Sequence, residues 1–314
     1  MWTSFDVFTD PEKAEAAREA FYELLRIGVA RSTMEGIAWT DSDRAEEVSG
    51  VRGAVGCFSF KAAHLWPYKL VMHLLSVAVS KGLNLQTNTP ILSLSQSTTA
   101  GAWTATTDRG TITTPKVIVT TNGYTAGLLP EYAGKIVPAR GICSHIIVPP
   151  GSKHPLLTCT HGLRLPGLGY DYLIPRNDGS IIVGGGQSTF RMHREQWHNV
   201  TDDSTLIKVA ENYFDGFIQQ NFIGWEDSEA TLDRVWTGIM GYNADSLPSI
   251  GEVPGRTGCY IEAGFEGHGM PAIFLAMKGI AKMVVEGMKY EGAGLPIVYK
   301  TTEERLNNTM DDTA

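Results

Sequence analysis

The residues best suited to chemistry are gathered in one glycine-rich stretch, residues 264–270. Glycines let a backbone approach a ligand without a Cβ in the way, and the apolar run that follows predicts a helix whose first turn presents unpaired N–H groups. Such a helix start suits a phosphate, a carboxylate or an electron-rich carbonyl edge. His268 and Glu266 lie in the stretch and Glu262 precedes it, so the loop also offers groups for proton transfer. A structural turn between a strand and a buried helix is the competing interpretation.

The elements that must position this loop are predicted from hydrophobic periodicity. The residues before the loop predict a strand, and those after it a helix. Helices are expected over residues 9–28, 41–50, 67–82, 202–220 and 272–287. Short strands are expected over residues 83–86, 91–94, 103–106, 111–113, 116–120, 142–148, 170–174, 180–183 and 230–239, with Asp108-Arg109-Gly110 as a hairpin turn. The polar residues from Thr301 onward are expected to fray.

Composition limits the class of protein. The chain has 314 residues, is 43% hydrophobic and carries a net charge of −8, which allows two packed lobes and argues against nucleic acid or an anionic membrane as partner. Its four cysteines form no CxxC pair and its histidines show no metal-ligand spacing, so we expect reduced thiols and no metal. The N-terminus has no signal pattern, and Lys278 and Lys282 interrupt the longest apolar stretch, so a cytoplasmic location is expected.

Four segments, taken together and in order, resemble the FAD-dependent amine and amino-acid oxidase family, which includes D-amino-acid oxidase, glycine oxidase and sarcosine oxidase. The first is Leu65-Trp66-Pro67-Tyr68-Lys69-Leu70. The second is the stretch 117–125 with 136–141, the third is 236–241 with 245–251, and the fourth is the glycine-rich loop. No single segment is decisive, but together they span roughly residues 50–290.

The resemblance implies a mixed α+β and α/β fold. Residues 136–255 would form an antiparallel substrate-domain sheet with helices. Residues 1–135 and 256–300 would belong to a truncated FAD-binding, Rossmann-like lobe, followed by a frayed tail over 301–314. FAD is the implied cofactor, and the residues implied to lie near its ring are Asn122, Gly123, Gly264, Gly267, His268, Gly269 and Met270.

One family feature is absent from these 314 residues. Family members begin with a strand, a GxGxxG turn and a helix that hold the ADP half of FAD, and this sequence contains no such turn. The glycines at 184–186 are no substitute, because residues 190–195 lack the apolar periodicity of a following helix. We therefore expect weak FAD binding or none, and both FAD and no cofactor stay open.

Candidate catalytic residues follow from the same comparison. Arg140 would bind an anionic substrate group or form a structural salt bridge, His268 and Glu266 would move a proton, and Tyr172 would line the pocket by analogy with family tyrosines. Met240 stands about where glycine and D-amino-acid oxidases carry a carboxylate-binding arginine. Because methionine cannot pair with a carboxylate, a larger, more apolar amine or a polycyclic molecule is favoured over a simple α-amino acid.

Three functions from different classes stay open. The first is an FAD-dependent oxidoreductase, the second a cofactor-free isomerase, cyclase or dehydratase, and the third a non-catalytic small-molecule binding module. One expectation is common to all of them. The helix over 271–287 is apolar nearly all round, so either the N-terminal helix 11–28 or a second copy of the chain is expected to cover it.

Overall fold

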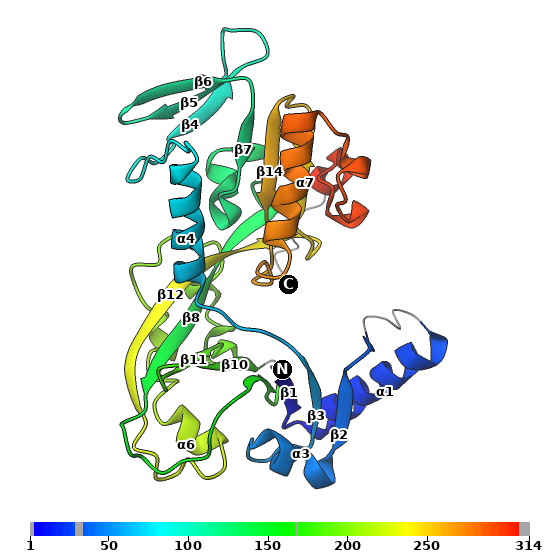
Figure 1. Ribbon diagram of the computed structural model, residues 1–314, viewed down its shortest axis with the longest axis vertical. Helices are drawn as coiled ribbons and strands as arrows, with labels where there is room; N and C mark the ends of the chain where they lie inside the picture. Colours follow the sequence, from blue (N-terminus) through cyan, green and yellow to red (C-terminus); the bar gives the residue numbers. More distant parts are fainter. Residues whose placement is uncertain (1–2, 29–33, 168, 308–314) are drawn as a thin grey trace. The chain divides into compact units, whose positions relative to one another are not determined.

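Residues 3–28, 34–167 and 169–307 are described by the structure, a computed structural model of the chain. The chain divides into two compact units, each assembled from separate stretches (Figure 1). Unit 1 comprises Met1–Ala78, Gly141–Gln196 and Ser204–Thr237. Unit 2 comprises Val79–Arg140, Trp197–Asp203 and Gly238–Ala314. The mixture of sheets and helices in both units confirms the expected fold class.

An eight-stranded sheet is the frame of unit 1, and two of its strands, β8 and β12, also contribute residues to unit 2. The strand order is β12-β8-β11-β10-β9-β1-β3-β2. β1 runs parallel to β9, while its other neighbour β3 and the β9-β10-β11-β8 series are antiparallel. The strands are β1 Thr3–Phe8, β2 Ala38–Asp41, β3 Gly56–Lys61, β8 Ile136–Ile147, β9 Thr160–Arg164, β10 Tyr170–Pro175, β11 Ile181–Gly184 and β12 Thr231–Asn243. Residues 3–61 thus share a sheet with residues 136–243, although the sequence assigned them to different segments.

Helices cover both faces of the N-terminal edge of this sheet. The helix α1, Pro11–Ile27, is capped by Asp10, whose carboxylate accepts from the N–H groups of Glu12 and Lys13, and it ends at Gly28 in the left-handed conformation. Its Phe21 packs on Phe58 of β3, with ring centroids 5.1 Å apart. The helix predicted over residues 9–28 is therefore confirmed.

The helix α3, Ser42–Ser49, begins after Asp41 and ends at Gly50, as predicted for residues 41–50. On the face of the sheet opposite α1, His161 of β9 donates from Nε2 to the carbonyl of Ser49, 2.9 Å away. Burial lowers the pKa of His161 to about 4, so the ring is neutral where it packs inside the protein. Two short helices also belong to unit 1, α5 at Gln187–Phe190 and α6 at Phe217–Asn221.

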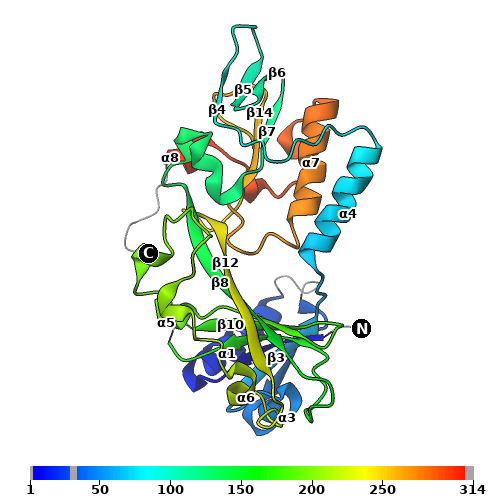
Figure 2. The ribbon, with the colours of Figure 1, turned by 90° about the vertical axis from the view of Figure 1, so that its left-hand side faces the viewer.

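Unit 2 contains two three-stranded sheets, β4-β5-β6 and β13-β14-β7 (Figure 2). Their strands are β4 Ser93–Gln96, β5 Trp103–Thr107, β6 Gly110–Thr114, β7 Val117–Val119, β13 Ser249–Glu252 and β14 Cys259–Ala263. The central strand β14 is parallel to β7 and antiparallel to β13. The side chains of neighbouring residues on β14 pack in two different hydrophobic clusters. Ile261 packs with Trp103 and Tyr132, and Tyr260 packs with Ile280 of the helix α7, Ile273–Glu286.

Several predictions of secondary structure were wrong. Residues 202–220 do not form one helix, because Gly216 adopts a left-handed conformation (φ 64°) and only the short α6 follows it. No strand forms at 83–86, where Leu83 and Leu85 are 47% and 44% exposed. The helix α4, Pro67–Ser80, forms as predicted, but none of its residues is buried, including Leu70, Leu74 and Val77, which were expected to face inward.

One expectation about the C-terminal part was wrong. Residues 301–307 are not frayed, since they include the helix α8, Glu303–Asn307, and Arg305 pairs with Asp245 at 2.6 Å. Residues 308–314 lie outside the described residues. On α7, Phe274, Leu275 and Val285 are 63%, 65% and 81% exposed, so what covers this helix stays a prediction. Among the described helices, none is both long and apolar enough to cross a membrane.

Candidate functional site

The glycine-rich loop of unit 2 joins the end of β14 to the start of α7, as the sequence predicted (Figure 1). Two other segments of unit 2 hold it. The side-chain oxygen of Asn122 accepts hydrogen bonds from the backbone N–H groups of Gly264 at 2.9 Å and Phe265 at 3.4 Å. The N–H of Glu266 donates to the carbonyl of Gly241 at 3.0 Å. Segments far apart in the sequence thus converge on one loop.

Glycine is required at several of these contacts. A Cβ on Gly264 would lie 2.7 Å from the side-chain nitrogen of Asn243, and one on Gly241 would lie 2.8 Å from Oδ1 of Asn122. Gly264 and Gly267 also have positive φ values of 78° and 73°, which other residues adopt only at a cost. At Gly267 the neighbour is the sulfur of Met240, 3.1 Å from where a Cβ would be. Met240 therefore packs against the loop. The side chain at position 240 is uncharged, unlike the arginine that glycine and D-amino-acid oxidases carry at about this place.

The loop leaves a group of backbone donors without partners. Within the part of the chain that the structure describes, no hydrogen bond is made by the N–H groups of Gly267, Gly269, Met270, Phe274 and Leu275. These donors surround the N-terminus of α7, where the helix dipole adds partial positive charge. The arrangement fits an electron-rich group, such as the carbonyl edge of a flavin ring or an anion.

Two glutamates next to the loop, Glu262 and Glu266, have raised pKa values. Glu262 on β14 is 3% exposed, and among the described residues neither of its oxygens has a hydrogen-bond partner. Burial raises its pKa to about 7. Burial also raises the pKa of Glu266 to about 7, although this carboxylate accepts a hydrogen bond from the N–H of Asn243. Both groups can therefore exchange a proton near neutral pH.

His268 has a defined tautomer in this loop. Its Nδ1 lies 2.7 Å from the carbonyl oxygen of Glu266. A carbonyl can only accept, so Nδ1 carries a proton, and in the neutral form of the ring Nε2 is the acceptor. The ring is exposed, so the local fold leaves it accessible to a ligand.

The other two predicted catalytic residues lie away from the loop in the chain. Arg140 is 8% exposed on β8, where its N–H donates to the carbonyl of Trp197 at 2.7 Å. Tyr172 lies on β10 of unit 1, and its hydroxyl is 2.9 Å from the sulfur of Cys143. Burial raises the pKa of Tyr172 well above its ordinary value, so this hydroxyl stays protonated. A joint role of these two residues with the loop stays a prediction.

Sequence reasoning missed the support that Asn243 and Gly241 give to the loop. Both lie in or next to the matched segments 236–241 and 245–251, but nothing in their spacing showed that they hold the loop. The side-chain nitrogen of Asn243 donates to the carbonyl of Leu247 at 2.7 Å and to the hydroxyl of Ser249 at 2.9 Å. Asn243 thereby fixes the turn between β12 and β13 as well as one side of the loop.

Comparisons with known proteins identify similar chains and the family. The chain is 28% identical over 235 residues to a protein described as probable oxidoreductase OrdL from Rhizobium meliloti, which corresponds to 73% of this chain and 49% of that protein. The chain thus spans about half the length of this curated relative.

Among solved structures, glycine oxidase from Geobacillus kaustophilus superimposes with a TM-score of 0.75 at 19% identity, covering 96% of this chain and 75% of that one. Iminodiacetate oxidase from Chelativorans sp. BNC1 gives a TM-score of 0.68 at 18% identity, with 96% and 75% coverage. At these identities the two structures show a shared fold. A family profile matches residues 2–283, and the chain belongs to the FAD dependent oxidoreductase family.

Proposed function

We propose that this chain supplies the substrate-domain sheet and the ring-binding loop of an FAD-dependent oxidoreductase that acts on a small amine-containing or polycyclic metabolite. The observation that carries the proposal is the group of N–H donors around Gly267 and Gly269, at the start of α7, that have no hydrogen-bond partner among the described residues. Such donors suit the electron-rich edge of a flavin ring. When bound, FAD supplies the acceptor for the electrons of the substrate.

The chain's own residues have the following roles in this proposal. Asn122 holds the loop by accepting a hydrogen bond from the N–H of Gly264. The backbone from Gly267 to Met270 contacts the edge of the flavin ring. Glu266, whose pKa is raised to about 7, accepts or releases a proton, and Nε2 of His268 offers a second acceptor. Arg140 and Tyr172 are proposed to contact the substrate.

The substrate class is inferred from Met240 and from the relatives. Met240 packs on Gly267, so this position offers sulfur and methylene groups in place of a guanidinium. The solved relatives named above are described as oxidases of glycine and iminodiacetate, which supports an amine as the substrate class. An apolar group next to the amine would contact Met240.

We further propose that these 314 residues hold the flavin ring but not the ADP half of FAD, because their sequence contains no GxGxxG turn. Calorimetric titration with riboflavin, FAD and ADP tests this directly. Riboflavin and FAD are expected to bind with similar affinity, and ADP is expected not to bind. Sub-micromolar FAD affinity together with measurable ADP binding would contradict the idea.

A matched pair of glycine variants locates the ring site. Gly267 and Gly255 have nearly the same left-handed φ, 73° and 72°, and nothing lies within 4 Å of a Cβ built on Gly255. The backbone cost of alanine is therefore similar at the two positions. Gly267→Ala is expected to weaken riboflavin binding, while Gly255→Ala leaves it unchanged. Equal binding by both variants would place the ring elsewhere.

The two perturbed carboxyls favour a second candidate function. A buried carboxyl with a pKa of about 7, such as Glu262, and a neighbouring one at Glu266 would suit an isomerase, cyclase or dehydratase that works without a cofactor. The visible spectrum of the purified protein distinguishes the two functions, because only bound flavin gives colour. A colourless protein that still converts a metabolite would support this second function.

A further inference from the structure

Trp66 contacts two cationic side chains immediately before α4. The guanidinium carbon of Arg176 lies 4.3 Å from the centroid of its ring, and Nζ of Lys69 lies 4.4 Å from it. The carbonyl of Trp66 accepts a hydrogen bond from the N–H of Leu70 at 3.2 Å, in the first turn of the helix. Because no residue of α4 is buried, the contacts of Trp66 matter for holding the start of this helix in place.

Arg176 lies in the turn between β10 and β11, where three groups fix its guanidinium. The turn itself is closed by the N–H of Gly179, which donates to the carbonyl of Arg176 at 3.0 Å. Nη2 pairs with a carboxylate oxygen of Asp178 at 3.0 Å, and Nη1 donates to Nε2 of His145 at 3.5 Å. The indole of Trp66 covers one face of the guanidinium. Since this group is rigid and planar, a change at one of its partners is transmitted to the others.

His145 on β8 is in its neutral form in this arrangement. Its Nδ1 lies 2.9 Å from Oδ2 of Asp233 on the neighbouring strand β12. A carboxylate can only accept, so Nδ1 carries a proton. Nε2 accepts the hydrogen bond from Arg176, and a ring nitrogen that accepts carries no proton. The other neighbouring strand, β11, places the uncharged Ile182 opposite His145. The two polar contacts together therefore require the neutral ring.

The charged groups that face His145 come from β12 and from the turn after β10. On β12 they are Asp233 and Arg234, whose Nε lies 2.8 Å from Oδ2 of Asp233. In the turn they are the guanidinium just described and Asp178. The hydrogen bond from His145 holds the pKa of Asp233 below its ordinary value, and the hydroxyl of Ser180 does so for the pKa of Asp178. Both carboxylates thus stay ionised in mildly acidic solution, so the imidazole is the group of this cluster that can change charge between about pH 5 and 8.

Protonation of His145 would place two donors and two positive charges against each other. The added proton on Nε2 would point at Nη1 of Arg176, 3.5 Å away. At such a distance, the repulsion between two like charges in water lowers the population of the contact by about fivefold. A cation stacked on an exposed aromatic ring is favoured by roughly twofold to fivefold. Trp66 is 48% exposed, so the repulsion is large enough to offset its stack with the guanidinium.

We propose that His145 is a pH-sensitive switch that controls whether Arg176 stacks on Trp66. With the neutral ring, Nε2 holds Nη1 and the guanidinium stays on the indole. With the protonated ring, the guanidinium turns away from Nε2, keeps its ion pair with Asp178 and leaves the indole, so the start of α4 is released. The stack is thus complete above the titration of His145 and is lost as the pH falls through it. All four residues belong to unit 1, and the switch does not rest on the proposed flavin binding.

Fluorine NMR of the full chain labelled with 5-fluorotryptophan measures the stack. The chain has seven tryptophans, and the resonance that disappears in Trp66→Phe identifies Trp66. This resonance is expected to shift as the pH falls from about 8 to 5, with the same midpoint as the C2 proton of His145. In His145→Gln, whose side chain does not titrate, the shift is expected to vanish. A Trp66 resonance that does not change with pH, or that titrates equally in His145→Gln, would overturn the proposal.

Two further variants test the coupling without altering His145. Arg176→Gln is expected to abolish the pH dependence of the Trp66 resonance and, by reciprocity, to raise the midpoint of His145 by about half a pH unit or more. Asp233→Asn removes the carboxylate that favours the protonated ring, so both midpoints are expected to move together to lower pH. Midpoints of Trp66 and His145 that separate in Asp233→Asn would show that another group controls the stack and would sink the assignment.

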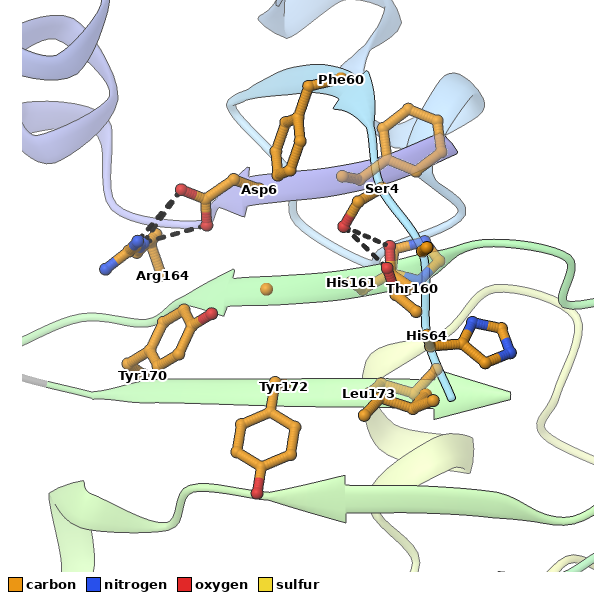
Figure 3. Close-up of a pocket in the computed structure, with 14 residues that line it drawn as sticks. Ser4, Asp6, Phe60, His64, Thr160, His161, Arg164, Tyr170, Tyr172 and Leu173 are labelled. Carbon is orange, nitrogen blue, oxygen red and sulfur yellow. Dashed lines mark hydrogen bonds and ion pairs between the residues drawn. The ribbon is translucent and has the colours of Figure 1, made fainter. Parts of the chain in front are cut away.

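Two other histidines serve as controls. His64 is two residues from Trp66 in the chain, but it lines a pocket over β9 and β10 together with Leu173 (Figure 3). His64→Gln is expected to leave the titration of Trp66 unchanged. His154 stacks on Trp225 with ring centroids 4.1 Å apart, so His154→Gln is expected to change the Trp225 resonance alone. Loss of the Trp66 transition in His64→Gln would assign the switch to His64 and contradict the proposal.

Discussion

Gly123 lies against the backbone carbonyl of Met240, so closely that a Cβ on Gly123 would be 2.7 Å from that oxygen. The contact joins the 3₁₀ turn after β7 to the end of β12, within unit 2. The neighbouring Asn122 holds the glycine-rich loop through the N–H of Gly264. The position of the loop therefore depends on this close packing of two backbones.

We predict that Gly123→Ala destabilises the protein by about 1–3 kcal/mol, because a backbone carbonyl has little room to yield. Gly127 lies in the same turn, and nothing is within 4 Å of a Cβ built on it. Gly127→Ala is thus expected to be neutral or slightly stabilising. Urea denaturation of the two variants measures the difference. Equal unfolding midpoints for the two variants would mean that the carbonyl of Met240 does not exclude a side chain at position 123.

Glu262 is predicted to make the stability of the protein depend on pH. Its pKa is about 7 in the folded protein and has its ordinary value of 4.5 when unfolded, so the folded state binds the proton more tightly. The free energy of unfolding should therefore fall as pH rises from about 4.5 to about 7, by on the order of 3 kcal/mol for this group.

The Glu262→Gln variant isolates this effect, since a glutamine cannot lose a proton. The wild type and the variant should be similar near pH 4.5, and the variant should be more stable at pH 8. Glu286→Gln, at the exposed end of α7, is the control and should follow the wild type. A wild-type protein that matches Glu262→Gln at pH 8 would show that Glu262 finds a partner on folding.

The exposed side of α7 is predicted to associate with a second copy of the chain. Phe274 and Leu275 are 63% and 65% exposed, next to Ile273 at 44%, while the opposite side of the helix is packed on β14. An apolar surface of this kind favours association in water. Sedimentation at increasing concentration should show a mass above that of the monomer.

The double variant Phe274→Lys and Leu275→Lys should shift the protein to the monomer without lowering its melting temperature, because both side chains are exposed. Met192→Lys is the control, since Met192 is 89% exposed in unit 1. It should leave the association unchanged. A wild type that stays monomeric at every concentration and does not bind ANS would contradict the prediction.

The strand, glycine loop and helix over residues 259–286 were predictable because each is encoded locally. Periodicity marks the strand and the helix, and glycines mark the turn. The capped helix at Pro11–Ile27 and the hairpin turn between Thr107 and Gly110 were predictable for the same reason. The order of matched segments also predicted the family, which the profile match over residues 2–283 confirms.

Other features depended on partners distant in the chain, which no local pattern records. β1 pairs with β9, more than 150 residues away, and this pairing brings Asp6 within hydrogen-bond distance of Arg164. The leucines of α4 have helical spacing, but their exposure depends on what packs against them. The raised pKa of Glu262 likewise results from tertiary burial on β14. The sequence by itself determined the loop, because short-range geometry encodes it, and the family, because four segments resemble it in order. Strand neighbours, burial and proton affinities were decided only by the tertiary structure, because they depend on residues distant in the chain.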